Sequence, residues 1–165
     1  MTEQMNVPKL RFSEFDGEWA LQQLKSITQL ITKGTTPKQF KSGQINFVKI
    51  ESLVGTQIEL ERCITIDTDT HNKELKRSIL QEHDILFAIA GATVGKVGIV
   101  GGNALPANTN QALAIIRLKD SSMLDFLVHV LLSRTMKNYI FQSVSVGAQP
   151  NLNLEQMGNF KYFTP

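Results

Sequence analysis

The pattern of apolar and polar positions predicts a helical first part, a strand-rich middle and a helical last part. The first part is predicted to form a helix from Gly17 to Gly34, with Asp16 as its N-cap and the glycine as its usual stop. Residues 1–16 show few periodic positions and are expected to form an irregular lead-in. The apolar stripe of this helix recurs at helical spacing and consists of Leu21, Leu24, Ile27 or Thr28, and Ile31.

Short apolar and β-branched runs dominate the middle of the chain. The run Ile85–Ala90 contains no polar residue, which is typical of a strand buried on both faces. A short helix is predicted over residues 73–80, where charged and apolar residues mix. The predicted strands cover residues 45–50, 63–66, 85–90, 97–100 and 112–118.

The last part of the chain carries two helix-start signals. Ser122 and Asp125 resemble a capping box and predict a helix that runs to about Gln142. A loop over Gly147–Asn151 follows, and Asn153 is predicted to cap a short final helix. The buried positions of the longer helix are predicted to include Leu124, Leu127, Leu131 and Ile140. The order of elements predicts an α/β (α+β) fold with a mixed or antiparallel sheet flanked by helices.

Composition narrows the protein class. The 165 residues match the usual size of one domain, and we expect a single domain over 1–165. A hydrophobic content of 42% argues against wholesale disorder. No apolar run approaches the roughly 20 residues that a membrane helix needs. Cys63 is the only cysteine, which excludes an internal disulfide framework. We therefore expect a soluble, cytoplasmic protein.

Charge is distributed unevenly, although the net charge is only +2. Residues 25–50 contain five lysines and no acid, and residues 85–119 contain three basic residues and no acid. Residues 51–84 hold eight acids against four bases. If the two acid-free stretches fold together, they form a positive face suited to polyanions.

The sequence lacks the usual signatures of catalysis. The segment from Gly91 to Lys96 resembles a phosphate loop, but it has three residues between its glycines instead of four, and Val97 replaces the Mg²⁺-binding Ser or Thr. We interpret these glycines as permitting a tight strand connection, although such a loop can also approach a DNA backbone. The histidines and Cys63 show no zinc spacing. A weaker alternative is a metal-dependent nuclease that uses Asp67, Glu74 and Lys76.

Uncharged polar residues are abundant, with 10 Asn, 12 Gln and 13 Thr. Several lie in predicted loops, at 108–111 and 149–151. Asn and Gln can pair bidentately with adenine in the major groove, whereas Lys and Arg pair with guanine and phosphate. Asn and Gly are also ordinary turn formers, and that interpretation stays open for each single residue.

Eight short segments stand out along the chain, at 7–12, 17–19, 33–38, 45–51, 84–98, 110–116, 147–153 and 163–165. Taken in order, they resemble the target-recognition domain of a type I restriction–modification specificity subunit, over Val7 to Pro165. One departure is His83, which stands where this family commonly has glycine. Pro165 lies where the first long spacer helix of a full subunit is expected to begin, so the chain resembles an isolated N-terminal recognition domain or a truncated subunit.

This resemblance implies sequence-specific binding of double-stranded DNA without catalysis. The domain would recognise one half of a split target and dock on a methyltransferase (modification) subunit, with a restriction subunit in the full complex. It implies no cofactor here, because adenosylmethionine, ATP and Mg²⁺ would belong to the partner subunits. An alternative is a protein-interaction module that holds the methyltransferase without reading DNA. The expected DNA-binding residues are Lys33, Thr35, Thr36, Lys38, Lys41, Lys49, Lys96, Asn108, Asn110, Gln111, Gln149 and Asn151.

Overall fold

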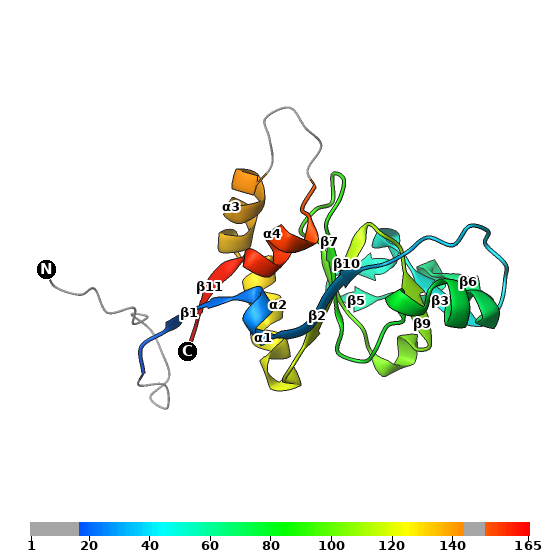
Figure 1. The fold of residues 1–165 in the computed structure, drawn as a ribbon, viewed down its shortest axis with the longest axis horizontal. Helices are drawn as coiled ribbons and strands as arrows, with labels where there is room; N and C mark the ends of the chain where they lie inside the picture. The colour runs from blue at the N-terminus through cyan, green and yellow to red at the C-terminus, as the bar shows by residue number, and fades with distance from the viewer. Residues whose placement is uncertain (1–16, 144–150) are drawn as a thin grey trace, which may run out of the picture.

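A four-stranded antiparallel sheet lies at the centre of the fold (Figure 1). The computed structural model describes residues 17–143 and 151–165. Each strand of this sheet pairs antiparallel with its neighbour, in the order β2-β10-β7-β8. The strands are β2 (Thr28–Lys33), β10 (Leu113–Leu118), β7 (Ile85–Ala88) and β8 (Val97–Ile99).

Both faces of the central sheet are covered. In β7, Ile85 and Phe87 face one hydrophobic cluster, whereas Leu86 and Ala88 face another, and all four residues are buried. This confirms the prediction that the uniformly apolar run is a strand buried on both sides. The alternation follows from the period of two in an extended chain.

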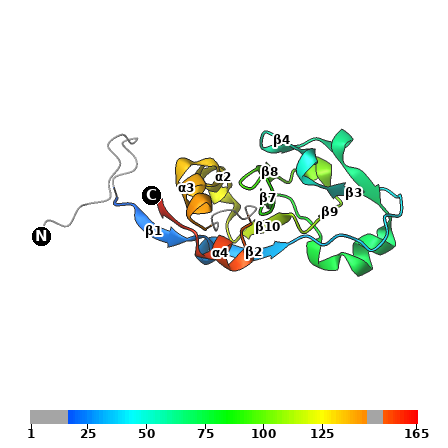
Figure 2. The ribbon, with the colours of Figure 1, turned by 90° about the horizontal axis from the view of Figure 1, so that it is seen from above.

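Helices and a two-stranded sheet cover the first face (Figure 2). The helices are α2 (Leu124–Leu132), α3 (Arg134–Ser143) and α4 (Leu154–Asn159). The small sheet pairs β1 (Ala20–Gln23) with β11 (Lys161–Thr164) in antiparallel fashion. Asn153 caps α4 in a capping box with Gln156, which confirms the predicted cap.

The second face of the central sheet packs on smaller strands. Here β4 (Leu53–Val54) and β5 (Gln57–Ile58) form a hairpin. A three-stranded sheet also packs on this side, with β3 antiparallel to β6 and parallel to β9, so the fold combines mixed and antiparallel sheets as predicted. Its strands are β3 (Ile45–Val48), β6 (Ile64–Ile66) and β9 (Ala107–Thr109).

The predicted helix over residues 17–34 is wrong. The chain instead forms β1, the single turn α1 (Leu24–Ile27) and then β2. Of the predicted apolar stripe, only Leu24 is fully buried. The residues before it pair with β11 and the residues after it pair with β10, as strands. Asp16, the predicted cap, lies outside the described residues. Gly34 does not end a helix. A Cβ there would collide with the backbone carbonyls of Thr109 and Asn110.

The predicted helix over residues 122–142 is divided in two. Ser133 is extended, with φ −71° and ψ 167°, and its hydroxyl donates to the Val130 carbonyl at 2.6 Å. Such side-chain bonds to the preceding turn compete with helix continuation. The start also differs, since Asp120 rather than Ser122 accepts the capping backbone hydrogen bond.

The predicted helix over residues 73–80 starts earlier and is irregular. It consists of a π-helical turn at Thr70–Glu74 and a 3-10 turn at Lys76–Ser78. Among the described residues, no helix is long and apolar enough to cross a membrane.

Candidate nucleic-acid interface

Several predicted DNA-binding segments meet at one end of the central sheet. In the strand register, Lys33 at the end of β2 lies opposite Ala114 near the start of β10. Ala88 at the end of β7 likewise lies opposite Leu113, while Val97 at the start of β8 pairs with Phe87. The segments after β2, before β10 and between β7 and β8 therefore leave the sheet at the same end.

Direct hydrogen bonds join the segment after β2 to the segment before β10. The Gly34 and Thr35 amides donate to the carbonyls of Leu113 and Thr109, at 3.1 and 2.9 Å. The Thr36 hydroxyl donates to the side-chain oxygen of Gln111. Glycine is required at position 34 because the two backbones approach too closely for a side chain. The structure thus brings two predicted groups of site residues together.

The lysines at the end of β2 and in the segment after it are available to a ligand. Lys33, Lys38 and Lys41 are all exposed, and none forms an ion pair within residues 17–143 and 151–165. The backbone amide of Lys38 donates to a carboxylate oxygen of Glu74 at 2.7 Å. An acid from the acidic middle stretch therefore lies among the lysines, so this face is less uniformly positive than the sequence predicted.

Two other predicted lysines are engaged within the protein. Lys49 Nζ pairs with Glu51 at 3.2 Å, and Lys96 Nζ donates to the Ile50 carbonyl at 3.1 Å. A hydrogen bond from the Glu51 backbone amide, and then the Lys49 ammonium, hold the pKa of Glu51 below its usual value. Lys49 and Lys96 therefore have a clear structural role, and a DNA phosphate would have to compete with these contacts.

Asn108 is not available as a base contact. Its side chain is fully buried, its Nδ2 donates to the Leu75 carbonyl at 3.1 Å, and its Oδ1 lies 2.5 Å from His71 Nδ1. The amide therefore has partners inside the protein and cannot reach a base edge. Nothing in the local sequence distinguishes Asn108 from its exposed neighbour Gln111, because burial is decided by residues that are distant in the chain.

Asn110 and Gln111 differ in their surroundings. Asn110 is partly buried, and its Oδ1 accepts the Ala112 amide at 3.1 Å, which closes a turn. Gln111 is exposed, and its Oε1 accepts the Thr36 hydroxyl, which leaves its NH₂ group free of any partner among the described residues. Gln111 is thus the better placed of the two to donate to a ligand.

The glycine-rich segment forms the connection between β7 and β8, as interpreted from the sequence. Gly91 and Gly95 have φ values of 83° and 95°, which other residues rarely adopt. Ala90 forms an isolated bridge with Asn151, and the Leu152 amide donates to the Ile89 carbonyl at 2.8 Å. Asn151 is exposed beside this connection, whereas Gln149 lies outside the described residues.

The carboxylates of the nuclease alternative serve separate structural contacts. Asp67 accepts the Thr70 hydroxyl at 2.5 Å and the Thr70 amide at 3.0 Å, and these hydrogen bonds, the hydroxyl's first, lower the pKa of Asp67. Glu74 accepts the Lys38 amide. Within the described ranges, no three His, Cys, Asp or Glu side chains gather in a way that could hold a metal ion. The geometry gives the nuclease alternative no support.

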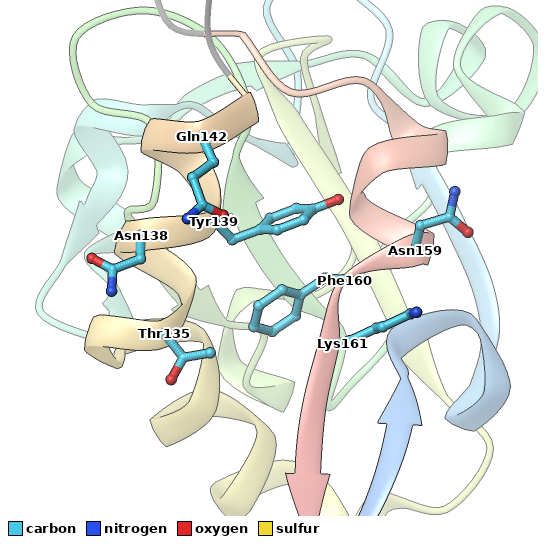
Figure 3. Close-up of a pocket in the computed structure, with 7 residues that line it drawn as sticks. All are labelled: Thr135, Asn138, Tyr139, Gln142, Asn159, Phe160 and Lys161. Atoms are coloured by element: carbon cyan, nitrogen blue, oxygen red, sulfur yellow. The ribbon is translucent and has the colours of Figure 1, made fainter.

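A groove of about 450 Å³ lies between α3 and the junction of α4 with β11 (Figure 3). The rings of Tyr139 and Phe160 lie next to each other there, with centroids 5.2 Å apart, and the Tyr139 hydroxyl donates to the Gln156 carbonyl at 2.8 Å. The lining holds one charged residue and no carboxylate, histidine or cysteine, so the groove offers no acid–base pair. The residues that line it are Thr135, Asn138, Tyr139, Gln142, Asn159, Phe160 and Lys161.

Residues 16–165 match the family described as type I restriction modification DNA specificity domain. A protein of Methanocaldococcus jannaschii named as a type I restriction enzyme specificity subunit is 24% identical over 97% of this chain and 39% of its own length.

Solved structures share the fold at low identity. The HsdS subunit of Thermoanaerobacter tengcongensis matches with a TM-score of 0.63 and 15% identity, over 89% of this chain and 38% of that one. A chain from a study of type I restriction–modification complex assembly matches with a TM-score of 0.67 and 16% identity, over 89% and 38%. The S subunit of M. genitalium matches with a TM-score of 0.56 and 14% identity, over 96% and 37%.

This chain therefore spans about two fifths of the length of these relatives. The family match covers most of the sequence, and the shared fold agrees with it. The chain belongs to the type I restriction–modification DNA specificity domain family.

Proposed function

We propose that this domain binds double-stranded DNA sequence-specifically and recognises one half of a bipartite target. The observation that carries the proposal is the contact between Thr36 and Gln111. It joins a segment with exposed lysines to a segment with an exposed amide, at one end of the central sheet. Proteins that read DNA combine phosphate contacts, which position the protein, with base contacts, which specify the sequence.

The two kinds of residue have different tasks in this proposal. Lys33, Lys38 and Lys41 neutralise phosphates and set the affinity, because phosphates are the same in every sequence. Gln111 donates to a base edge, with its side chain oriented by the Thr36 hydroxyl. An oriented amide loses less conformational freedom on binding than a mobile one, which favours selective contacts.

Membership of the family supports a proposal about partners and catalysis. We infer that the domain holds its DNA beside a methyltransferase subunit, within a cytoplasmic complex that also includes a restriction subunit. Methylation of an adenine amino group requires the base to leave the duplex, so positioning the DNA is a separate task from the chemistry. Adenosylmethionine, ATP and Mg²⁺ are assigned to the partner subunits, and the domain itself is proposed to be non-catalytic.

The test is selection of binders from a randomised duplex pool, followed by titrations at several salt concentrations. Wild type should enrich a short half-site. Lys38→Ala and Lys41→Ala should weaken binding to all duplexes alike, and each should reduce the log–log salt slope by about 0.9. Gln111→Ala should weaken the selected half-site by about 1–3 kcal/mol, with little effect on random DNA or on the slope.

Lys119→Ala is the matched control. It removes the same charge, but Lys119 follows β10 at the opposite end of the sheet, where its Nζ donates to the Ser26 carbonyl. This variant should keep the salt slope. If folded wild type enriches no sequence, the proposal fails and a docking module for the methyltransferase is favoured. If the control lowers the slope as much as Lys38→Ala does, the proposed face is wrong.

A further inference from the structure

The segment that carries the exposed lysines also carries an exposed aromatic residue, which lies between Lys38 and Lys41 in the sequence. Phe40 is 51% exposed, and Lys38 and Lys41 beside it are exposed as well. A single exposed apolar residue is common and needs no explanation. The position of this one is informative, because the segment that carries it is held in place and also carries two exposed lysines, which attract polyanions.

The segment that carries Phe40 is anchored on both sides. On one side, the Lys38 amide is bonded to Glu74 at 2.7 Å, and Thr36 is bonded to Gln111. On the other side, Gly43 lies so close to β6 that a Cβ would collide with the Ile66 carbonyl. The intervening residues are therefore presented from two fixed points.

The ring of Phe40 is also held. It packs edge-to-face on Phe47, with ring centroids 5.4 Å apart and an interplanar angle of 79°. Phe47 is fully buried in the cluster formed with Ile45, Ile66 and Leu75. Edge-to-face pairs are a favoured arrangement for aromatic rings. One part of the Phe40 ring is thus fixed on the core, and the other part faces solvent.

We propose that Phe40 contacts the C5-methyl group of a thymine in the major groove, a role that rests on the proposed DNA-binding function. Apolar contact with this methyl group is a known way to distinguish thymine, and Phe is among the residues that make it. Apolar wedges between stacked bases are instead a feature of minor-groove binding, and they project from the protein into the base step. Because about half of the residue is covered by the protein, the exposed part suits a surface contact and not insertion.

The test replaces thymine by deoxyuridine, which lacks the methyl group and keeps the same hydrogen-bonding edge. Each thymine of the half-site selected by wild type is substituted in turn, and Kd is measured for wild type, Phe40→Leu and Phe40→Ala. At one position wild type should lose about fourfold in affinity, the value of one buried methyl-sized group. Phe40→Ala should bind both duplexes equally, and Phe40→Leu should keep part of the difference.

A second measurement covers the case in which Phe40→Ala does not fold. The sensitive thymine is replaced by 5-iododeoxyuridine, and wild type is irradiated and digested. The cross-linked peptide should contain Phe40. In the titrations, the proposal is overturned if the half-site has no A·T pair or if wild type tolerates deoxyuridine at every position. It is also overturned if folded Phe40→Ala still binds the thymine duplex more tightly than the deoxyuridine duplex by the wild-type factor. In the cross-linking experiment, a cross-link to another peptide overturns it. Failure to select any half-site overturns the proposed function itself, whereas these results overturn only the role of Phe40.

Discussion

Replacing His83 by glycine is expected to stabilise the protein, because His83 has a φ of 70°. The residue lies in a four-residue turn closed by the Asp84 amide, which donates to the Gln81 carbonyl at 3.1 Å. A positive φ at the third position of such a turn favours glycine. The His83 side chain is exposed and forms no hydrogen bond or ion pair among the described residues, so little is lost on its removal.

The magnitude follows from two opposing effects. The left-handed conformation costs an L-residue about 1–2 kcal/mol, and histidine falls at the low end because it adopts this region more often than most residues. Glycine adds about 0.4–1 kcal/mol of conformational entropy to the unfolded chain. The net gain is about 0.5 kcal/mol, or roughly 1–2 °C in Tm for a chain of 165 residues.

Urea denaturation and thermal melting measure this change, with His83→Ala as the matched control. Alanine removes the same imidazole but keeps the Cβ that causes the strain. His83→Ala should therefore leave stability unchanged or lower it. The explanation by backbone conformation is refuted if alanine stabilises as much as glycine, or if glycine gives no gain while the urea dependence of unfolding stays unchanged.

Three further outcomes are expected. Asp84 is fully buried, and its carboxylate accepts hydrogen bonds from Nε and Nη2 of Arg117 at 2.7 Å each, so Asp84→Ala should lower the unfolding free energy of the protein by about 3 kcal/mol. Adding Arg117→Leu should recover part of this loss, and a double variant less stable than Asp84→Ala would contradict the prediction. Tyr162→Phe should raise the unfolding free energy by about 1 kcal/mol in urea denaturation, because the Tyr162 hydroxyl is buried without a hydrogen-bond partner among the described residues. The same burial raises the pKa of Tyr162 to about 12. A loss of stability in this variant would contradict the prediction and show that the hydroxyl has a partner. Hydrogen bonds lower the pKa of Glu51 and Asp67, so the stability they contribute is present above their unfolded pKa values near 4 and is lost as pH falls through the lower folded values. Melting curves of Asp67→Asn and wild type should therefore converge as the pH falls below about 4.

Part of the candidate site depends on tertiary contacts that the sequence pattern does not show. Asn108 and Gln111 both lie in a polar segment that resembles a surface loop, yet Asn108 is fully buried and Gln111 is exposed. The difference arises because the π-helical turn at Thr70–Glu74 packs on Asn108 and supplies His71 as a partner. The hydrogen bond from the Lys38 amide to Glu74 likewise joins segments that are distant in the chain.

The elements that could be predicted are those formed by local interactions. The strand β7 could be predicted because an uninterrupted apolar run must be buried on both faces. The cap of α4 could be predicted because Asn153 and Gln156 are three residues apart and bond to each other's backbone. The same holds for the connection with Gly91 and Gly95, whose φ values are positive. In each case the decisive groups are close in the chain.

Contacts between distant segments determined that residues 17–34 form strands and that the residues of the candidate site lie together. Leu21, Leu24 and Ile31 fit one face of a helix, but the segment pairs instead with β11 and β10, both far along the chain. A local period cannot reveal such partners, because strand pairing depends on edges that only the folded sheet presents. The same pairing places Lys33 beside the start of β10 and so brings the lysines to Gln111. The sequence thus supplied the residue types of the candidate site, and the sheet register decided which of them meet.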